Sequence, residues 1–209
     1  MKTNAASRTG LALLALAIVT SPAYAHHMMG GVLPSTFMQG LMSGLGHPVI
    51  GPDHFAFILA IGIAVAFLPA GLALIATFIV ASTAGVLVHL GQFNIPYVEA
   101  LVAVSLIVAA TMLMLSRTRV SGPWIALACV AGLVHGYAFG ESIVGAEREV
   151  LGAYLLGLAL ITAAVAMAVM ALTQRLASAN ALSPNIVRIS GAAIGILGTV
   201  LLVTSIATA

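Results

Sequence analysis

Residues 47–68 read HPVIGPDHFAFILAIGIAVAFL, a short polar cluster that leads directly into a long apolar run. The rest of the chain is similarly apolar. Hydrophobic residues make up 62% of its 209 residues, charged residues make up 6%, and the mean hydropathy is +1.19. Soluble domains carry roughly 25% charged residues. The composition therefore predicts an all-α polytopic membrane protein with the lipid bilayer as its surroundings.

The first 25 residues are predicted to be a cleaved signal peptide. Lys2 and Arg8 form a positive start, residues 11–20 form a short apolar stretch, and Ala23-Tyr24-Ala25 matches a cleavage site. The alternative is an uncleaved first span, but about ten apolar residues fall short of the ~20 that a spanning helix needs. Cleavage would leave a periplasmic N-terminal segment, residues 26–33, and a single transmembrane domain, residues 34–209.

Apolar runs separated by proline, glycine and charged residues predict six transmembrane helices in the mature chain. A shorter apolar segment, Pro34 to Leu45, precedes them and is interpreted as a half-membrane helix. The six predicted spans are Pro52 to Leu68, Gly71 to Leu90, Tyr97 to Leu115, Pro123 to Gly140, Val150 to Leu172 and Ile186 to Ile206.

The arginines predict the orientation of these spans. Arg117 and Arg119 follow the third span, and Arg175 and Arg188 flank the loop before the sixth. With six spans and a periplasmic mature N-terminus, both loops lie in the cytoplasm, as the positive-inside rule requires. We therefore expect a multi-pass protein of the bacterial inner membrane with both termini in the periplasm.

The polar cluster at residues 47–54 is the strongest candidate site. Its two imidazoles and one carboxylate belong to His47, Asp53 and His54, and the prolines and glycine between them interrupt the helix. We expect His47 to close the short helix and Pro52 to open the first span. Ionisable residues are costly at membrane depth, and broken helices there recur at ion sites. The alternative is a helix cap with interfacial histidines.

Three further candidate ligands fall at the same predicted end of the spans: His89, His135 and Glu141. A packed, hydrogen-bonded histidine is a near-equal alternative for His89. His135 lies beside a row of glycines, residues 132, 136 and 140, which predicts close approach of a neighbouring helix. Glu141 is six positions from His135 and would point away from it on an ideal helix, so their joint coordination of an ion needs an irregular backbone.

His26 and His27 would begin the mature chain and could collect metal ions in the periplasm; a disordered tail is the equal alternative. Imidazoles with one or two carboxylates suit nickel, cobalt, zinc or copper. The expected partners are thus a divalent metal ion and the bilayer, without a permanent cofactor. Only seven basic residues are present and none forms a run, which argues against nucleic acid as a partner.

The sequence resembles the HupE/UreJ family of nickel/cobalt transporters. The resemblance rests on the signal peptide, the six spans, the motif from His47 to His54, and the later segment from His135 to Glu141. It implies Ni²⁺ or Co²⁺ uptake, with His47, Asp53 and His54 as ligands. Because the sequence has no Walker-type glycine loop for nucleotide, a facilitator or secondary transporter is expected. The second segment departs from the family pattern, because Phe139 stands where many members carry another histidine.

Two other functions stay open from the residues alone. One is an intramembrane zinc hydrolase in which Asp53 or Glu141 activates water, although the chain lacks an H-E-x-x-H helix, so a non-enzyme is expected. The other is a metal sensor or assembly subunit that transports nothing. The sequence also leaves a homo-oligomer open, because Gly191 and Gly195 could pack within one subunit or between two.

Overall fold

The computed structural model describes residues 32–115 and 120–207, and these residues form helices and connecting loops without a strand. The predicted signal peptide and the Arg117–Arg119 loop lie outside them. The helices are α2 Phe37–Ile50, α3 Pro52–Val65, α4 Gly71–Leu90, α5 Val98–Met114, α6 Ser121–Gly140, the 3₁₀ turn η2 Glu141–Ile143, α7 Arg148–Ser178 and α8 Pro184–Ala207. The all-α prediction is confirmed for this part of the chain.

The chain bends by 78° between α2 and α3. Gly51 adopts an extended conformation at the bend, and Pro52 occupies the first turn of α3, where its missing N–H costs no helical hydrogen bond. The predicted break is confirmed, but α2 continues to Ile50, so His47 lies in its last turn instead of ending it. Helices α2 and α3 have 14 residues each, which gives each a length of about 21 Å. This is less than the ~30 Å thickness of the hydrocarbon core.

Within residues 32–115 and 120–207, four helices are long and apolar enough to cross a bilayer: α4, α6 extended by η2, α7 and α8. The bent pair α2–α3 would make a fifth span if it crosses as one unit. The apolar helix α5 is shorter, at 17 residues. The protein is therefore a multi-pass membrane protein, and six crossings remain a prediction.

Glycines bring the helices together in pairs. A methyl group on Gly136 of α6 would lie 2.0 Å from the Ser82 carbonyl oxygen of α4, and one on Gly44 of α2 would lie 2.0 Å from the Tyr154 carbonyl oxygen of α7. The close approach predicted from the α6 glycine row is thus confirmed. Gly191 of α8 packs against α5 within the same chain.

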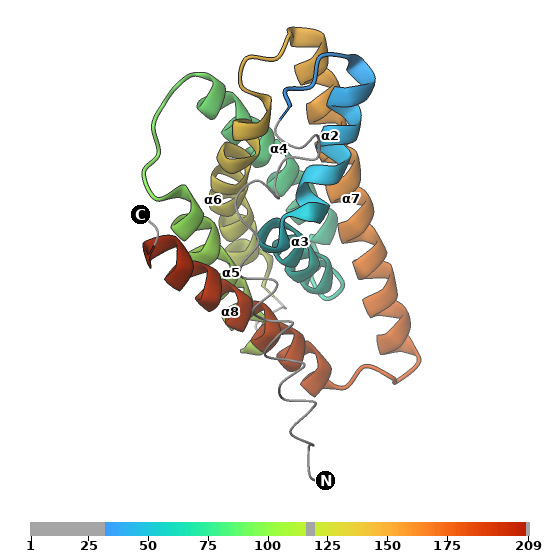
Figure 1. Cartoon of the computed structure of the whole chain (residues 1–209). Helices are drawn as coiled ribbons and strands as arrows, with labels where there is room; N and C mark the ends of the chain where they lie inside the picture. The colour runs from blue at the N-terminus through green and yellow to red at the C-terminus, as the bar shows by residue number, and fades with distance from the viewer. Residues whose placement is uncertain (1–31, 116–119, 208–209) are drawn as a thin grey trace, which may run out of the picture.

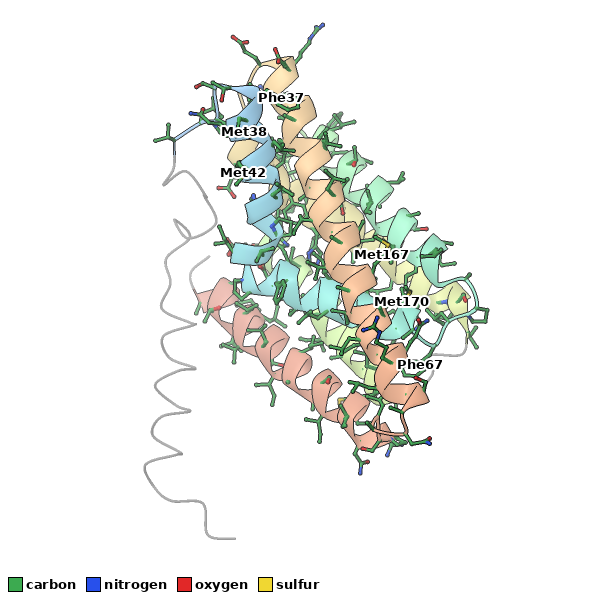
Figure 2. The ribbon with its side chains drawn as sticks, turned by 90° about the vertical axis from the view of Figure 1, so that its right-hand side faces the viewer. Phe37, Met38, Met42, Phe67, Met167 and Met170 are labelled. Carbon is green, nitrogen blue, oxygen red and sulfur yellow. The ribbon has the colours of Figure 1, made fainter. Side chains whose placement is uncertain are left out.

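The outer surface of α2 and α7 is apolar. Figure 2 shows Phe37, Met38 and Met42 along α2, with Met167 farther down α7. Met38 is 61% exposed and Met42 is 43% exposed. Such side chains suit contact with lipid, and they point away from the interior in which the histidines are buried.

Several of the loops gather at two opposite ends of the helix bundle (Figure 1). The loop between α6 and α7, the start of α2 and the loop after α4 lie at one end, drawn uppermost. The loop between α7 and α8 lies at the other, and a hydrogen bond from the Ala70 N–H to Ser121 Oγ joins the start of α4 to the start of α6. Glu147 and Arg148 are therefore at one end, and Arg175 and Arg188 are near the other.

Candidate metal site

His47 is anchored to the end of the bundle that carries η2. It lies in the last turn of α2 and is 3% exposed. Its Nδ1 is 3.0 Å from Ser142 Oγ of η2 and 3.0 Å from the Tyr154 hydroxyl of α7. Ser142 and Tyr154 are both distant from His47 in the sequence. The packing of α2 on α7 therefore sets the position of this imidazole.

His54 and His135 form a direct pair between α3 and α6. Their Nδ1 atoms are 2.8 Å apart, and both rings are buried, with exposures of 2% and 0%. The other nitrogen of His135, Nε2, lies 2.9 Å from Ser105 Oγ of α5. Each nitrogen of His135 thus already has a hydrogen-bonding partner from another helix.

Asp53 opens α3 beside His54. One of its oxygens, Oδ1, accepts the backbone N–H of His54 at 2.8 Å, and the other, Oδ2, is 3.8 Å from His54 Nε2. A carboxylate in the first turn is favoured by the helix dipole. Its side chain is 16% exposed, so it is the most accessible of the polar groups at the break.

Phe139 lies against the imidazoles from both sides of the break. Its ring centroid is 4.3 Å from that of His54 and 5.1 Å from that of His47, and the two imidazole centroids are 5.8 Å apart. We call His47, His54 and His135 the histidine cluster. The structure brings these three predicted residues together with Asp53 at the helix break, where the apolar ring of Phe139 packs against the imidazoles of His47 and His54.

The side chains of the histidine cluster and Asp53 are not yet in positions to coordinate one ion. Within residues 32–115 and 120–207, no three His, Cys, Asp or Glu side chains are arranged so that they could hold an ion as they stand. His47, His54 and Asp53 supply imidazole and carboxylate donors, the mixture that nickel, cobalt, zinc and copper accept. Coordination of one ion by all three would require side-chain movement at the break.

The other predicted ligands lie apart from this cluster. His89 stacks on Tyr137, with ring centroids 4.4 Å apart, and its buried Nδ1 has no hydrogen-bond partner within the described chain. The Tyr137 hydroxyl in turn donates to the Phe93 carbonyl oxygen, so this group packs the loop after α4. Glu141 is exposed on η2. His26 and His27 lie outside the described residues.

Sequence reasoning missed the hydroxyl groups around the cluster: Ser105, Ser142 and Tyr154. Each is buried and lies within hydrogen-bonding distance of a histidine. Ser105 is a polar residue in an otherwise apolar stretch of α5, which is the one signal that could have drawn attention to it. Tyr154 and Ser142 gave no such signal, because their partner His47 is 107 and 95 residues away in the sequence.

Comparison with known proteins gives one family. Searches of curated proteins and of solved structures found no match. A family model described as HupE / UreJ protein matches residues 14–201, which include the whole histidine cluster and its hydroxyl partners. This family is associated with nickel and cobalt transport and is of a membrane-transporter type. The chain belongs to the HupE / UreJ family.

Proposed function

We propose that this protein takes up Ni²⁺ or Co²⁺ across the bacterial inner membrane and binds the ion at His47, Asp53 and His54. The observation that carries the proposal is the break at Gly51, which places an imidazole from α2 and an imidazole–carboxylate pair from α3 in one buried region. Burying such groups in an apolar bundle is costly, so it favours a functional role.

The distance between Asp53 and His54 suits a shared ion. Two atoms that bind one transition-metal ion at about 2.1 Å each lie at most about 4.2 Å apart. Asp53 Oδ2 and His54 Nε2 are 3.8 Å apart, so a single ion could bridge them after a small adjustment. The His47 ring centroid is 5.8 Å from that of His54, so His47 is near enough to reach the same ion after side-chain movement.

The proposed entry is periplasmic. His47 bonds to Ser142 of η2, so the site lies toward the end that carries Glu147, whereas Arg175 and Arg188 are near the opposite end. Arginines favour the cytoplasmic side. An ion entering from the periplasm would therefore meet the histidine cluster early in its passage.

The membrane potential can supply the driving force. Moving one elementary charge across it is worth about 2.3 kcal/mol per 100 mV, and a dication gains roughly twice that amount. The sequence has no Walker-type glycine loop for nucleotide. A facilitator or a secondary transporter is therefore the proposed class.

Uptake into sealed proteoliposomes tests the proposal. The purified protein is reconstituted with an inside-negative potential, and entry of radiolabelled Ni²⁺, Co²⁺ and Zn²⁺ is measured for wild type, Asp53→Asn and His54→Gln. We expect wild type to accumulate Ni²⁺ or Co²⁺ and both variants to lose uptake. Glu149→Gln is the matched control, because it removes an exposed carboxylate at the start of α7, away from the cluster.

The other outcomes separate the alternatives. If no ion enters but metal binds stoichiometrically, the protein is a sensor or assembly subunit instead of a transporter. If Zn²⁺ binds and a lipid or peptide bond is cleaved, the hydrolase hypothesis replaces ours. Either result would overturn the proposed uptake.

A further inference from the structure

Two chains of hydrogen bonds end on the imidazoles of the histidine cluster, and each begins at a hydroxyl that is itself tied to a backbone carbonyl. One chain runs through Ser105, His135 and His54. The other runs through Tyr154 and His47. Because every bond in a chain has one proton, the position of each proton follows from the bond before it.

The first chain starts at Ser105. Its oxygen is 2.7 Å from the carbonyl oxygen of Val102, a contact that requires a proton between the two oxygens, and only the serine can supply it. The hydroxyl is then an acceptor toward His135 Nε2 at 2.9 Å. A neutral His135 must therefore carry its proton on Nε2, and its Nδ1 has the lone pair.

The tautomer of His135 determines that of His54. The two Nδ1 atoms are 2.8 Å apart, so one must donate to the other. Because His135 Nδ1 is the acceptor, His54 carries its proton on Nδ1 and keeps the lone pair on Nε2. That nitrogen is the one 3.8 Å from Asp53 Oδ2, so two electron-pair donors face each other where a cation would stabilise both.

The second chain gives the same result at His47. The Tyr154 hydroxyl is 2.8 Å from the Phe139 carbonyl oxygen and donates its proton there. Its oxygen is then an acceptor toward His47 Nδ1 at 3.0 Å. His47 therefore also carries its proton on Nδ1 and has its lone pair on Nε2. Ser142 Oγ is 3.1 Å from the Phe139 carbonyl oxygen and donates its own proton there, so at 3.0 Å from His47 Nδ1 it is a second acceptor for the same N–H.

We propose that Ser105 and Tyr154 are positioning residues that hold His54 and His47 in the Nδ1–H tautomer, so that both present Nε2 to the ion, and that His135 acts through His54 instead of binding metal itself. The assignment of these nitrogens as metal donors rests on the proposed function. Metal-binding histidines commonly donate their other N–H to a fixed acceptor, and loss of such a partner typically lowers metal affinity about 10- to 100-fold.

The tautomers can be measured without metal. Full-length protein labelled with ¹⁵N-histidine is placed in lipid bilayers at alkaline pH, where imidazoles are neutral. Signals are assigned by their loss in His47→Gln, His54→Gln and His135→Gln. We expect Nδ1–H for His47 and His54, and Nε2–H for His135. An Nε2–H signal for His54 or His47 would overturn the assignment.

Variants then test the two hydroxyls. Ser105→Ala removes the acceptor for His135 Nε2–H. We therefore expect mixed tautomers at His54 and a Co²⁺ affinity lower by about 10-fold or more. Ser105→Thr keeps the hydroxyl and is expected to restore the single tautomer and the wild-type Co²⁺ affinity. At His47 two hydroxyl acceptors lie 3.0 Å from Nδ1, so Tyr154→Phe is combined with Ser142→Ala, and mixed tautomers at His47 are expected for the double variant. Ser82→Ala is the matched control, because Ser82 is also buried and donates to its own helix, at the Phe78 carbonyl oxygen, without facing an imidazole.

Failure of this inference and failure of the proposed function give different results. Unchanged tautomers in Ser105→Ala, or shifted tautomers with unchanged Co²⁺ affinity, would overturn the positioning role even if wild type transports metal. Absence of metal binding to wild type, with the expected tautomers present, would overturn the proposed function and with it the role of Nε2 as a metal donor.

Discussion

Gly51 lies at the helix break and leaves no room for a side chain next to Asp53 and His54. A methyl group at this position would lie 2.8 Å from His54 Cδ2 and 2.9 Å from Asp53 Oδ1. Its φ of −75° and ψ of 111° are open to any residue. An added methyl group therefore displaces the two side chains of the site more than it strains the chain.

Gly51→Ala is thus expected to reduce Ni²⁺ or Co²⁺ uptake by about 10-fold, equivalent to ~1.4 kcal/mol of lost binding, while the melting temperature changes little. Uptake into proteoliposomes and thermal unfolding in detergent measure the two effects. Gly122→Ala is the control, since a methyl group there meets nothing within 4 Å. Wild-type uptake by Gly51→Ala would show that the present positions of Asp53 and His54 do not matter for transport.

A substitution at Phe139 can add a metal ligand to the site. Its ring is fully buried against the rings of His47 and His54. Phe139→His would place another imidazole beside both of these rings. Without metal, a buried polar ring that lacks partners lowers stability by about 1–3 kcal/mol. Metal that binds the native state restores stability by an amount that grows with the logarithm of the ratio of metal concentration to Kd.

We therefore expect Phe139→His to lower the melting temperature of the metal-free protein and to show a larger increase on addition of Ni²⁺ than wild type does. Phe139→Leu controls for loss of the aromatic ring. A nickel-induced increase no larger than that of wild type would mean that the ion does not bind next to this position.

Close glycine contacts with α7 hold α2, the helix that carries His47. A methyl group on Gly44 would lie 2.0 Å from the Tyr154 carbonyl oxygen, and one on Gly157 of α7 would lie 2.4 Å from the Leu41 carbonyl oxygen. Both contacts are with backbone atoms, which cannot rotate away. A larger residue therefore moves α2 as a whole and separates His47 from Tyr154.

Gly44→Ala is expected to destabilise the protein by about 1–3 kcal/mol, as overpacking of a close interface typically does, and to weaken Co²⁺ binding. Thermal unfolding and a Co²⁺ titration measure both. Gly152→Ala, on α7 where a methyl group meets nothing within 4 Å, is the matched control. Wild-type stability in Gly44→Ala would show that α2 is not held by this contact.

Local sequence signals predicted some of these helices well. Proline and glycine located the break between α2 and α3, and the glycine row of α6 predicted the close approach of a neighbouring helix, which the structure identifies as α4. The partners of each histidine could not be predicted. His54 meets His135 across 81 residues, and His47 meets Tyr154 across 107. Helices that are apolar on all sides carry no amphipathic pattern, so the sequence did not reveal that His135 faces α3 while His89 faces Tyr137.

The direction of transport depends on which end of the helix bundle faces the periplasm. The histidine cluster bonds to η2, next to the loop that contains Glu147, and Ser178 ends α7 at the opposite end. The arginines near that opposite end favour the cytoplasm. The cluster should then be reached from outside the cell.

Single cysteines at the two ends test this orientation. In a Cys129→Ser background, which removes the one native cysteine, we expect a membrane-impermeant maleimide to label Glu147→Cys in spheroplasts. Ser178→Cys should react only after lysis. The background protein without cysteine controls for nonspecific labelling. The reverse pattern would place the helix break nearer the cytoplasm, and a cation would then meet His47, Asp53 and His54 on its way out of the cell, so that the same site would serve export.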